Sequence, residues 1–253
     1  MLFHAFWAAC MLRARICRDT RQAMDLPLVW PKPKRRNLPY VHKIPAWSSN
    51  AGVEEQHLEF TIESVVAQGK PWNEKRFLYR AKTQNDDVIV KFTRRYCADL
   101  HQFCAKRGHA PELLGYGTVP GGWHVVVMEF VDQDISKTLA HYAPTHLDRW
   151  EEDLTRLVEE FHGEGYVHGD LRDANLIVRR GEPERIILVD YDWGGKHGDV
   201  SFPSRHLHED LAEGELESLE ITKVHDHRVL RFTIANLRLP ILLGDEADEM
   251  DVS

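Results

Sequence analysis

Short segments of alternating apolar and polar residues fill the stretch from residue 57 to residue 131 of this 253-residue chain. Leu58, Phe60 and Ile62 alternate with polar neighbours, which is the period of two expected for a half-buried β-strand. The predicted elements are strands near residues 58–62, 77–81 and 88–92, a helix at 95–107, and strands at 115–118 and 123–130. This part of the chain is therefore predicted to hold three strands, a helix and two further strands.

The second half of the chain has a mainly helical pattern. Five apolar residues recur at helical spacing, so we expect a helix with one buried face. They are Trp150, Leu154, Leu157, Val158 and Phe161. Two short strands are predicted near residues 176–178 and 186–189, on either side of a turn at residues 181–183.

The two ends of the chain differ from this middle part in charge. Residues 1–50 contain nine Lys or Arg and only two Asp or Glu, although the whole chain has a formal net charge of −8. A basic, Pro-containing segment before an acidic body is typical of a leader and linker. We therefore divide the chain into a leader and linker at 1–56, a sheet-rich part at 57–131, a helical part at 132–240 and an acidic tail at 241–253.

Charge and composition narrow the partners and the location. The negative net charge argues against general nucleic-acid binding, and no apolar run reaches the roughly 18 residues of a membrane span. Four cysteines without a C-x-x-C pair favour an intracellular compartment, cytoplasmic or nuclear. The leader has three interpretations: a disordered or partly helical segment, a mitochondrial presequence, or a nuclear address at Lys32–Arg36.

The strongest chemical signal lies between residues 167 and 178, which read VHGDLRDANLIV. Asp170 and Asn175 are five residues apart on a predicted loop, and fifteen residues after Asn175 a second apolar run ends at Asp190. Phosphoryl transfer needs a carboxylate that orients the attacking hydroxyl group, together with hard oxygen ligands for Mg²⁺. The spacing therefore indicates a phosphotransferase site.

At these residues the chain resembles the protein-kinase superfamily, whose catalytic loop is H-R-D-x-x-x-x-N followed by D-F-G. Here the loop begins His168-Gly169-Asp170, and the later triplet is Asp190-Tyr191-Asp192. The H-G-D form is similar to that of atypical kinases and of aminoglycoside- or choline-type kinases, and residues 189–196 resemble kinase-like proteins abundant in fungi. The resemblance covers residues 57–235 and implies a two-lobed α+β fold. That fold has an antiparallel five-stranded lobe, a reduced helical lobe and an active site between them.

The resemblance implies ATP and Mg²⁺ as cofactors and gives roles to the loop residues. Asp170 would be the catalytic base, and Asn175 and Asp190 would hold Mg²⁺. Arg172 would offset the charge of the transferred phosphoryl group, or else be a surface residue paired with its neighbour Asp173. Asp192 stands where the family has Gly, so it is either an additional metal ligand or a solvated turn carboxylate.

Lys91 ends the segment Val88-Ile89-Val90-Lys91, which resembles the V-A-I-K motif of the family. A Lys on an apolar strand is costly to bury unless it is paired. The resemblance implies that Lys91 binds the α- and β-phosphates; the alternative is an edge-strand Lys that faces water. The family pairs this Lys with an acid on the following helix, and the best-placed acid here is Asp99.

The connection between the lobes should follow the fifth strand. Met128 would then flank the adenine, and the backbone of Glu129 and Val131 would meet the adenine edge. In the family a helical Asp braces the catalytic loop, and Asp226 is the candidate here. Each of these assignments rests on position along the chain, and the side chains at 128–131 are equally compatible with plain strand residues.

The chain also departs from the family pattern. No G-x-G-x-x-G stands between the first two strands, where Gly69 is isolated, and Gly169 replaces the Arg of H-R-D. Only 27 residues follow Asp226, so the helices that dock peptide substrates in ordinary kinases are expected to be reduced or missing.

Two classes of function follow from these features. The first is an ATP- and Mg²⁺-dependent phosphotransferase acting on a hydroxyl group, either of a protein, which overall likeness slightly favours, or of a small molecule, which the H-G-D loop favours. The second is a pseudokinase that serves as a binding scaffold, because the glycine-rich loop is missing.

Overall fold

The computed structural model describes residues 39–47, 56–66, 77–131, 139–179, 185–204, 207, 211 and 218–250. Side chains within residues 140–144 and 240–250 are not part of this description. The leader up to residue 38, the segment around Gly69 and the turn at 181–183 lie outside the described residues. The expectations for those three segments therefore remain predictions.

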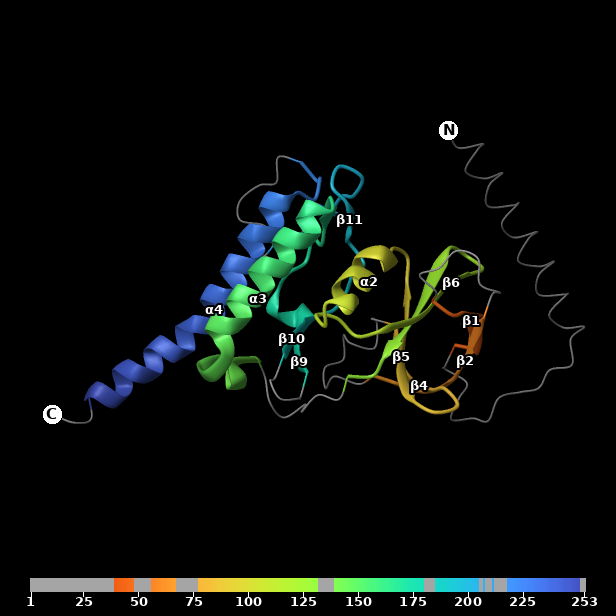
Figure 1. The fold of residues 1–253 in the computed structure, drawn as a ribbon, viewed down its shortest axis with the longest axis horizontal. Helices are drawn as coiled ribbons and strands as arrows, with labels where there is room; N and C mark the ends of the chain where they lie inside the picture. Colours follow the sequence, from red (N-terminus) through yellow and green to blue (C-terminus); the bar gives the residue numbers. More distant parts are fainter. Residues whose placement is uncertain are drawn as a thin grey trace, which may run out of the picture. The chain divides into compact units, whose positions relative to one another are not determined.

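The first part of the described chain forms a five-stranded antiparallel sheet with the order β3-β4-β5-β7-β6 (Figure 1). Its strands are β3 (Thr61–Val65), β4 (Leu78–Lys82), β5 (Asp87–Thr93), β6 (Leu113–Val119) and β7 (Trp123–Glu129). The predicted order of three strands, a helix and two strands is confirmed. The helix is α2 (Ala98–Lys106), which contacts β6 and the long helix α3 (Leu139–Gly163).

A small two-stranded sheet precedes the main one. Strand β1 (Lys43–Pro45) pairs with β2 (His57–Glu59), and Ile44 packs over Gly115 of β6. The boundary at residue 57 was placed between a linker and the first lobe. In the structure a strand already forms at residues 43–45, because Ile44 alternates with exposed neighbours and is itself buried. One buried residue in a Pro-rich segment gives too short a pattern to be recognised from the sequence.

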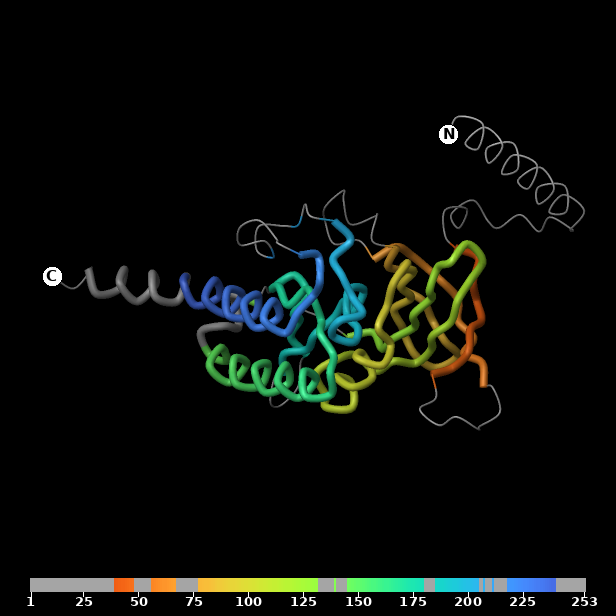
Figure 2. Tube along the Cα trace, turned by 90° about the horizontal axis from the view of Figure 1, so that it is seen from above, coloured from red at the N-terminus to blue at the C-terminus, as the bar shows by residue number. Residues whose placement is uncertain are grey.

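The second part is mainly helical. Helices α3 and α4 (Lys223–Met250) pack side by side (Figures 1 and 2). Short antiparallel pairs lie beside them: β9 (Leu176–Arg179) with β10 (Arg185–Leu188), and β8 (Tyr166–Val167) with β11 (Gly195–Lys196). Helix α4 continues through most of the segment that was predicted to be an acidic tail.

One apolar core joins the two helices to α2 and to the residues that follow β8 and β10. The periodic residues of α3 are all buried in this core, as their helical spacing predicted; they are Trp150, Leu154, Leu157, Val158 and Phe161. The expected α+β architecture, an antiparallel five-stranded lobe followed by a mainly helical one, is confirmed. Among the described residues, no helix has the length and apolarity that crossing a membrane would require.

Candidate active site

The loop that carries Asp170 is held in place by hydrogen bonds to Asp226 of α4. Asp226 is 1% exposed, and its two carboxylate oxygens accept hydrogen bonds from the backbone N–H groups of His168 and Gly169, both at 2.8 Å. Nε2 of His162 lies 3.0 Å from the same carboxylate. A buried carboxylate with three polar partners fixes the backbone on which it acts. The bracing role expected for Asp226 is confirmed.

The backbone of Gly169 explains why this chain has H-G-D in place of H-R-D. Gly169 has a φ of +84°, a conformation in which a side chain is strained. A Cβ atom there would also lie 2.9 Å from Cδ1 of Ile221. The loop therefore reaches Asp226 through a turn that only glycine adopts easily.

His168, the residue before Gly169, is completely buried. Burial lowers the pKa of its imidazole, so the ring is neutral at pH 7, and its Nδ1 accepts a hydrogen bond from the N–H of Asp170 at 3.2 Å. The ring also packs edge-on against Tyr191, with 5.2 Å between the ring centroids. His168 thus links the orientation of Asp170 to the residue that follows Asp190.

Asp170, the predicted base, is 8% exposed and is bound by its neighbour Arg172. Nε and Nη2 of Arg172 donate to the two carboxylate oxygens of Asp170 at 2.6 and 3.0 Å. Asn175 is buried in the short 3₁₀ helix η3 (Asp173–Asn175) and donates from Nδ2 to the carbonyl of Asp170 at 3.0 Å. The predicted base, arginine and amide ligand therefore form one hydrogen-bonded unit.

Lys91 of β5 meets the carboxylates of Asp190 and Asp192. Its Nζ lies 2.6 Å from Oδ1 of Asp190 and 2.7 Å from Oδ1 of Asp192, and the side chain of Lys91 is only 8% exposed. Burial lowers the pKa of Lys91, but the two carboxylates outweigh it and the pKa is raised overall. Lys91 is therefore a buried, charged, paired residue, and the alternative of an edge-strand lysine facing water is wrong.

Asp192 is the more crowded of the two carboxylates. Burial, followed by the nearby charge of Asp190, raises its pKa to about 6, although Lys91 and Thr93 act in the opposite direction. The hydroxyl group of Thr93 donates a hydrogen bond to Oδ2 of Asp192 at 2.9 Å. Asp190 itself has a φ of +68°, which is unusual for a residue with a side chain. Two carboxylates are thus gathered around a single ammonium group.

The partner predicted for Lys91 was wrong. Asp99 stands in the first turn of α2 and is exposed, while Lys91 pairs with Asp190 and Asp192. Asp99 was chosen because it is the best-placed acid on the helix that follows Lys91. The observed partners lie 99 and 101 residues away and depend on how the two parts of the chain fold together.

Helix α2 still contributes to the site, through a residue that the sequence did not indicate. His101 stacks on Tyr191 with 4.7 Å between ring centroids, and Tyr96 and the carbonyl of Pro111 each lie 2.8 Å from a ring nitrogen. The N–H of Cys97 donates to the carbonyl of Tyr191 at 3.0 Å. Burial lowers the pKa of His101 to about 4. The helix is therefore anchored to the Asp190–Asp192 triplet by its first turn; only the aromatic residue at 191 hinted at this.

Five of the predicted site residues line one cavity of about 400 Å³. They are Lys91, Asp170, Arg172, Asp190 and Asp192. The remaining lining comes from the ends of β4, β5 and β7 and from the residue after Asp192: Phe77, Leu78, Phe92, Thr93, Arg94, Trp123 and Trp193. The structure thus brings together predicted site residues that are up to 101 positions apart in the sequence, Lys91 and Asp192.

The residues predicted to meet adenine lie at the end of β7 (Met128 and Glu129) and just after it (Val131), and they do not line this cavity. Met128 is 8% exposed and packs in a cluster with Ala98 and Leu113. The N–H of Glu129 donates to the carbonyl of Glu112 at 2.9 Å, and its carboxylate accepts from Arg179 at 2.7 Å. The N–H of Glu129 is therefore engaged within the protein, and the adenine contacts of Met128, Glu129 and Val131 stay predictions.

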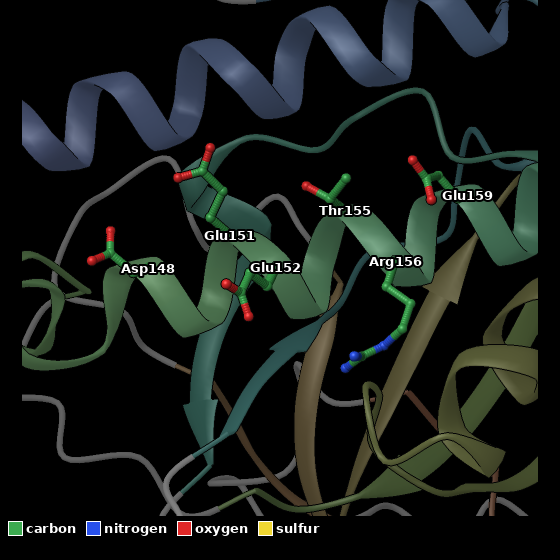
Figure 3. Close-up of a pocket in the computed structure, with 6 residues that line it drawn as sticks. All are labelled: Asp148, Glu151, Glu152, Thr155, Arg156 and Glu159. Carbon is green, nitrogen blue, oxygen red and sulfur yellow. The ribbon is translucent and has the colours of Figure 1, made fainter.

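A larger hollow of about 620 Å³ lies along α3, but none of the predicted site residues lines it (Figure 3). All of its lining residues belong to that one helix: Asp148, Glu151, Glu152, Thr155, Arg156 and Glu159. Arg238 of α4 binds two of the acids, Asp148 and Glu151, at 2.9 and 2.7 Å. We interpret it as the polar surface of a helix, and we place the chemistry in the smaller cavity.

The donor set of the cavity fits a hard divalent cation. Carboxylate oxygens are ligands that Mg²⁺ prefers, and a cation would offset the negative charge of Asp190 and Asp192. Asn175, the third predicted ligand, does not line the cavity. Within the described residues, no group of three or more His, Cys, Asp or Glu side chains is arranged to hold a metal. In proteins Mg²⁺ is usually held by one or two carboxylates together with substrate phosphates.

Comparison with known proteins defines the class of this domain. The structure matches that of the Cydia pomonella granulovirus kinase PK-1 with a TM-score of 0.52 and 14% identity, covering 70% of this chain and 67% of that one. At this identity the likeness shows the fold, which is the protein-kinase-like α+β fold. Residues 67–192, which include Lys91, Asp170, Asn175, Asp190 and Asp192, match the family model of the RIO domain. The chain thus has a protein-kinase-like fold, and its residues 67–192 are similar to the RIO domain.

No curated protein sequence matches the chain significantly. Neither the RIO domain nor the granulovirus kinase is specifically a fungal protein or an aminoglycoside or choline kinase. Those narrower resemblances therefore gain no support from them.

Proposed function

We propose that the protein transfers the γ-phosphoryl group of ATP to a hydroxyl group in an Mg²⁺-dependent reaction. The observation that carries the proposal is that Lys91, Asp170, Arg172, Asp190 and Asp192 all line the same cavity. Such a cavity joins a phosphate-binding cation, a carboxylate base and two carboxylates that suit Mg²⁺. The match of residues 67–192 to the RIO domain supports the same chemistry.

Each residue has a defined task in this proposal. Asp170 orients the acceptor hydroxyl and takes its proton, while Arg172 offsets charge on the transferred group. Lys91 exchanges its contacts with Asp190 and Asp192 for oxygens of the α- and β-phosphates. Asn175, Asp190 and Asp192 would hold Mg²⁺, which when bound neutralises phosphate charge. A protein Ser or Thr is the slightly favoured acceptor, and a small-molecule hydroxyl is the alternative.

A pseudokinase scaffold is the second candidate, and one observation favours it. In this structure Arg172 binds Asp170 in a bidentate manner, and Lys91 is bound by both Asp190 and Asp192. A site whose charges are satisfied internally gains less from a nucleotide, because these pairs must be rearranged on binding. The scaffold reading predicts weak or metal-independent nucleotide binding and no turnover.

A thermal-shift titration with ATP, with and without Mg²⁺, separates the two candidates. Ligand at 100 times its Kd adds about 2.7 kcal/mol of stability, which is a Tm shift on the order of 5–10 °C for a chain of this size. We expect an Mg²⁺-dependent shift in the wild type and in Asp199→Ala, an exposed turn acid outside the cavity. Asp190→Ala should lose the shift. No shift in the wild type at millimolar ATP would favour the scaffold.

A further inference from the structure

Arg94 is a cavity residue to which the proposed mechanism gives no task. It follows the last residue of β5 and lines the cavity together with Lys91, Asp170 and Arg172. Its guanidinium stacks over the ring of Trp123 at 4.1 Å and donates a hydrogen bond to the carbonyl of Gly121. The β6–β7 turn thus holds the guanidinium in place at the edge of the cavity.

The charge of Arg94 is not balanced in the way the other cavity cations are. Lys91 has two carboxylate partners and Arg172 has Asp170. No carboxylate among the described residues pairs with Arg94, whose contacts are a ring face and a neutral carbonyl. An exposed, pre-positioned guanidinium without an acidic partner is suited to an anion, because its planar fork matches the oxygens of phosphate.

The strand register shows which part of a nucleotide would come near Arg94. Val88 of β5 pairs with Glu129, near the predicted adenine end, and Thr93 pairs with His124 at the opposite end of β7. Lys91, which is expected to contact the α- and β-phosphates, lies between them. Because a strand advances about 3.3 Å per residue, Thr93 at the end of β5 stands roughly 7 Å beyond Lys91, in the direction in which the phosphates lead away from adenine. Arg94 is the next residue.

We propose that Arg94 binds the terminal phosphate of the nucleotide, an inference that rests on the proposed phosphotransferase function. Asp170 must lie close to this phosphate for transfer to occur, and Arg94 lines the same cavity as Asp170. A guanidinium in this position supplies a phosphate contact that does not depend on a G-x-G-x-x-G sequence, which the chain lacks. Trp123 and Gly121 act as positioning residues, because their contacts orient the guanidinium of Arg94.

The test compares two nucleotides that differ only at the terminal phosphate. Calorimetric Kd values for Mg²⁺-ADP and for a non-hydrolysable Mg²⁺-ATP analogue would be measured on the wild type, Arg94→Ala and Arg94→Lys. Arg107→Ala is the matched control, since Arg107 also stacks on an aromatic ring, that of Phe103 at 3.5 Å, but does not line the cavity. Because Arg94 is exposed, its substitution is expected to preserve the fold.

We expect Arg94→Ala to weaken the ATP analogue about tenfold or more, as loss of charge-assisted hydrogen bonds predicts, and to leave ADP within about twofold. Arg94→Lys should fall between, and Arg107→Ala should match the wild type. Equally weakened binding of both nucleotides, or unchanged binding of both, would overturn the assignment of Arg94. Either result would leave the proposed function intact, and unchanged binding would also fit a role of Arg94 toward an anionic acceptor. A wild type that binds neither nucleotide would refute the proposed function, and this inference with it.

Discussion

Carboxylates serve opposite purposes in two neighbouring regions of this protein. At the brace, Asp226 is buried and both its oxygens accept hydrogen bonds from backbone N–H groups of the loop that carries Asp170. In the cavity, Asp190 and Asp192 keep about 30% of their side-chain surface exposed and share the ammonium group of Lys91. The first carboxylate is satisfied by groups that cannot move away, whereas the other two are paired with a flexible side chain that can.

The difference explains how a charged site can be both well ordered and able to bind a ligand. The brace and the stacked pair of His101 and Tyr191 fix the backbone around Asp170 and Asp190. The ion pairs of Lys91 with the two carboxylates, and of Arg172 with Asp170, face the cavity. Substitutions in the first region should therefore affect folding, and substitutions in the second should affect ligand binding.

The largest effect on stability is expected for Asp226→Ala. Removing this carboxylate leaves two buried N–H groups without an acceptor, and each such group costs about 1–3 kcal/mol. We expect a loss of about 3–5 kcal/mol in the free energy of unfolding, measured by urea denaturation. Asp190→Ala should change it by less than about 1 kcal/mol, since its partner Lys91 retains Asp192. Equal losses in the two variants would abolish the distinction between the regions.

Acid should weaken the anchor between α2 and Tyr191. The pKa of His101 is lowered to about 4 in the folded protein, whereas an unfolded His titrates near 6.5. The folded state therefore binds this proton less readily, and stability present above about pH 6.5 is lost as pH falls toward 4. The loss from this residue is about 3 kcal/mol. Thermal melts between pH 7.5 and 4 should show a flatter pH dependence in His101→Gln; an unchanged slope would remove His101 from the account.

Gly169→Ala should have a smaller effect on the same side of the comparison. The left-handed conformation costs a residue with a side chain about 1–2 kcal/mol, and the close approach to Ile221 adds to this. We expect destabilisation of about 2 kcal/mol in chemical denaturation. Gly163→Ala is the matched control, because its added Cβ meets nothing within 4 Å and its φ is not positive. Similar costs for the two variants would show that the turn at Gly169 is not strained.

Much of the sheet and of the catalytic loop was predictable because both are encoded locally. The alternation in β4, the apolar run of β5 and the helical spacing in α3 each arise within a dozen residues. The loop from His168 to Asn175 is likewise a contiguous motif. Asp226 was predicted from its place in a family pattern. Its hydrogen bonds to the backbone of His168 and Gly169 give that prediction a physical reason.

The partners of charged residues were predicted less well, because they depend on tertiary contacts. Nothing near Lys91 in the sequence indicates that Asp192 rather than Asp99 binds it. The stacking of His101 on Tyr191 and the position of Arg94 against Trp123 likewise join distant segments. Strand β1 was missed because only one of its three residues is buried.

The most direct test of the central claim is turnover by the wild type compared with Asp170→Ala. Production of ADP from Mg²⁺-ATP, with candidate hydroxyl acceptors and with water, would be followed alongside the Kd for the nucleotide. The account predicts measurable turnover in the wild type, and its loss by about 100-fold or more in Asp170→Ala, with a similar Kd in both. Full turnover in Asp170→Ala would contradict the assignment of the base. Absence of turnover in the wild type with every acceptor, despite nucleotide binding, would contradict the phosphotransferase itself.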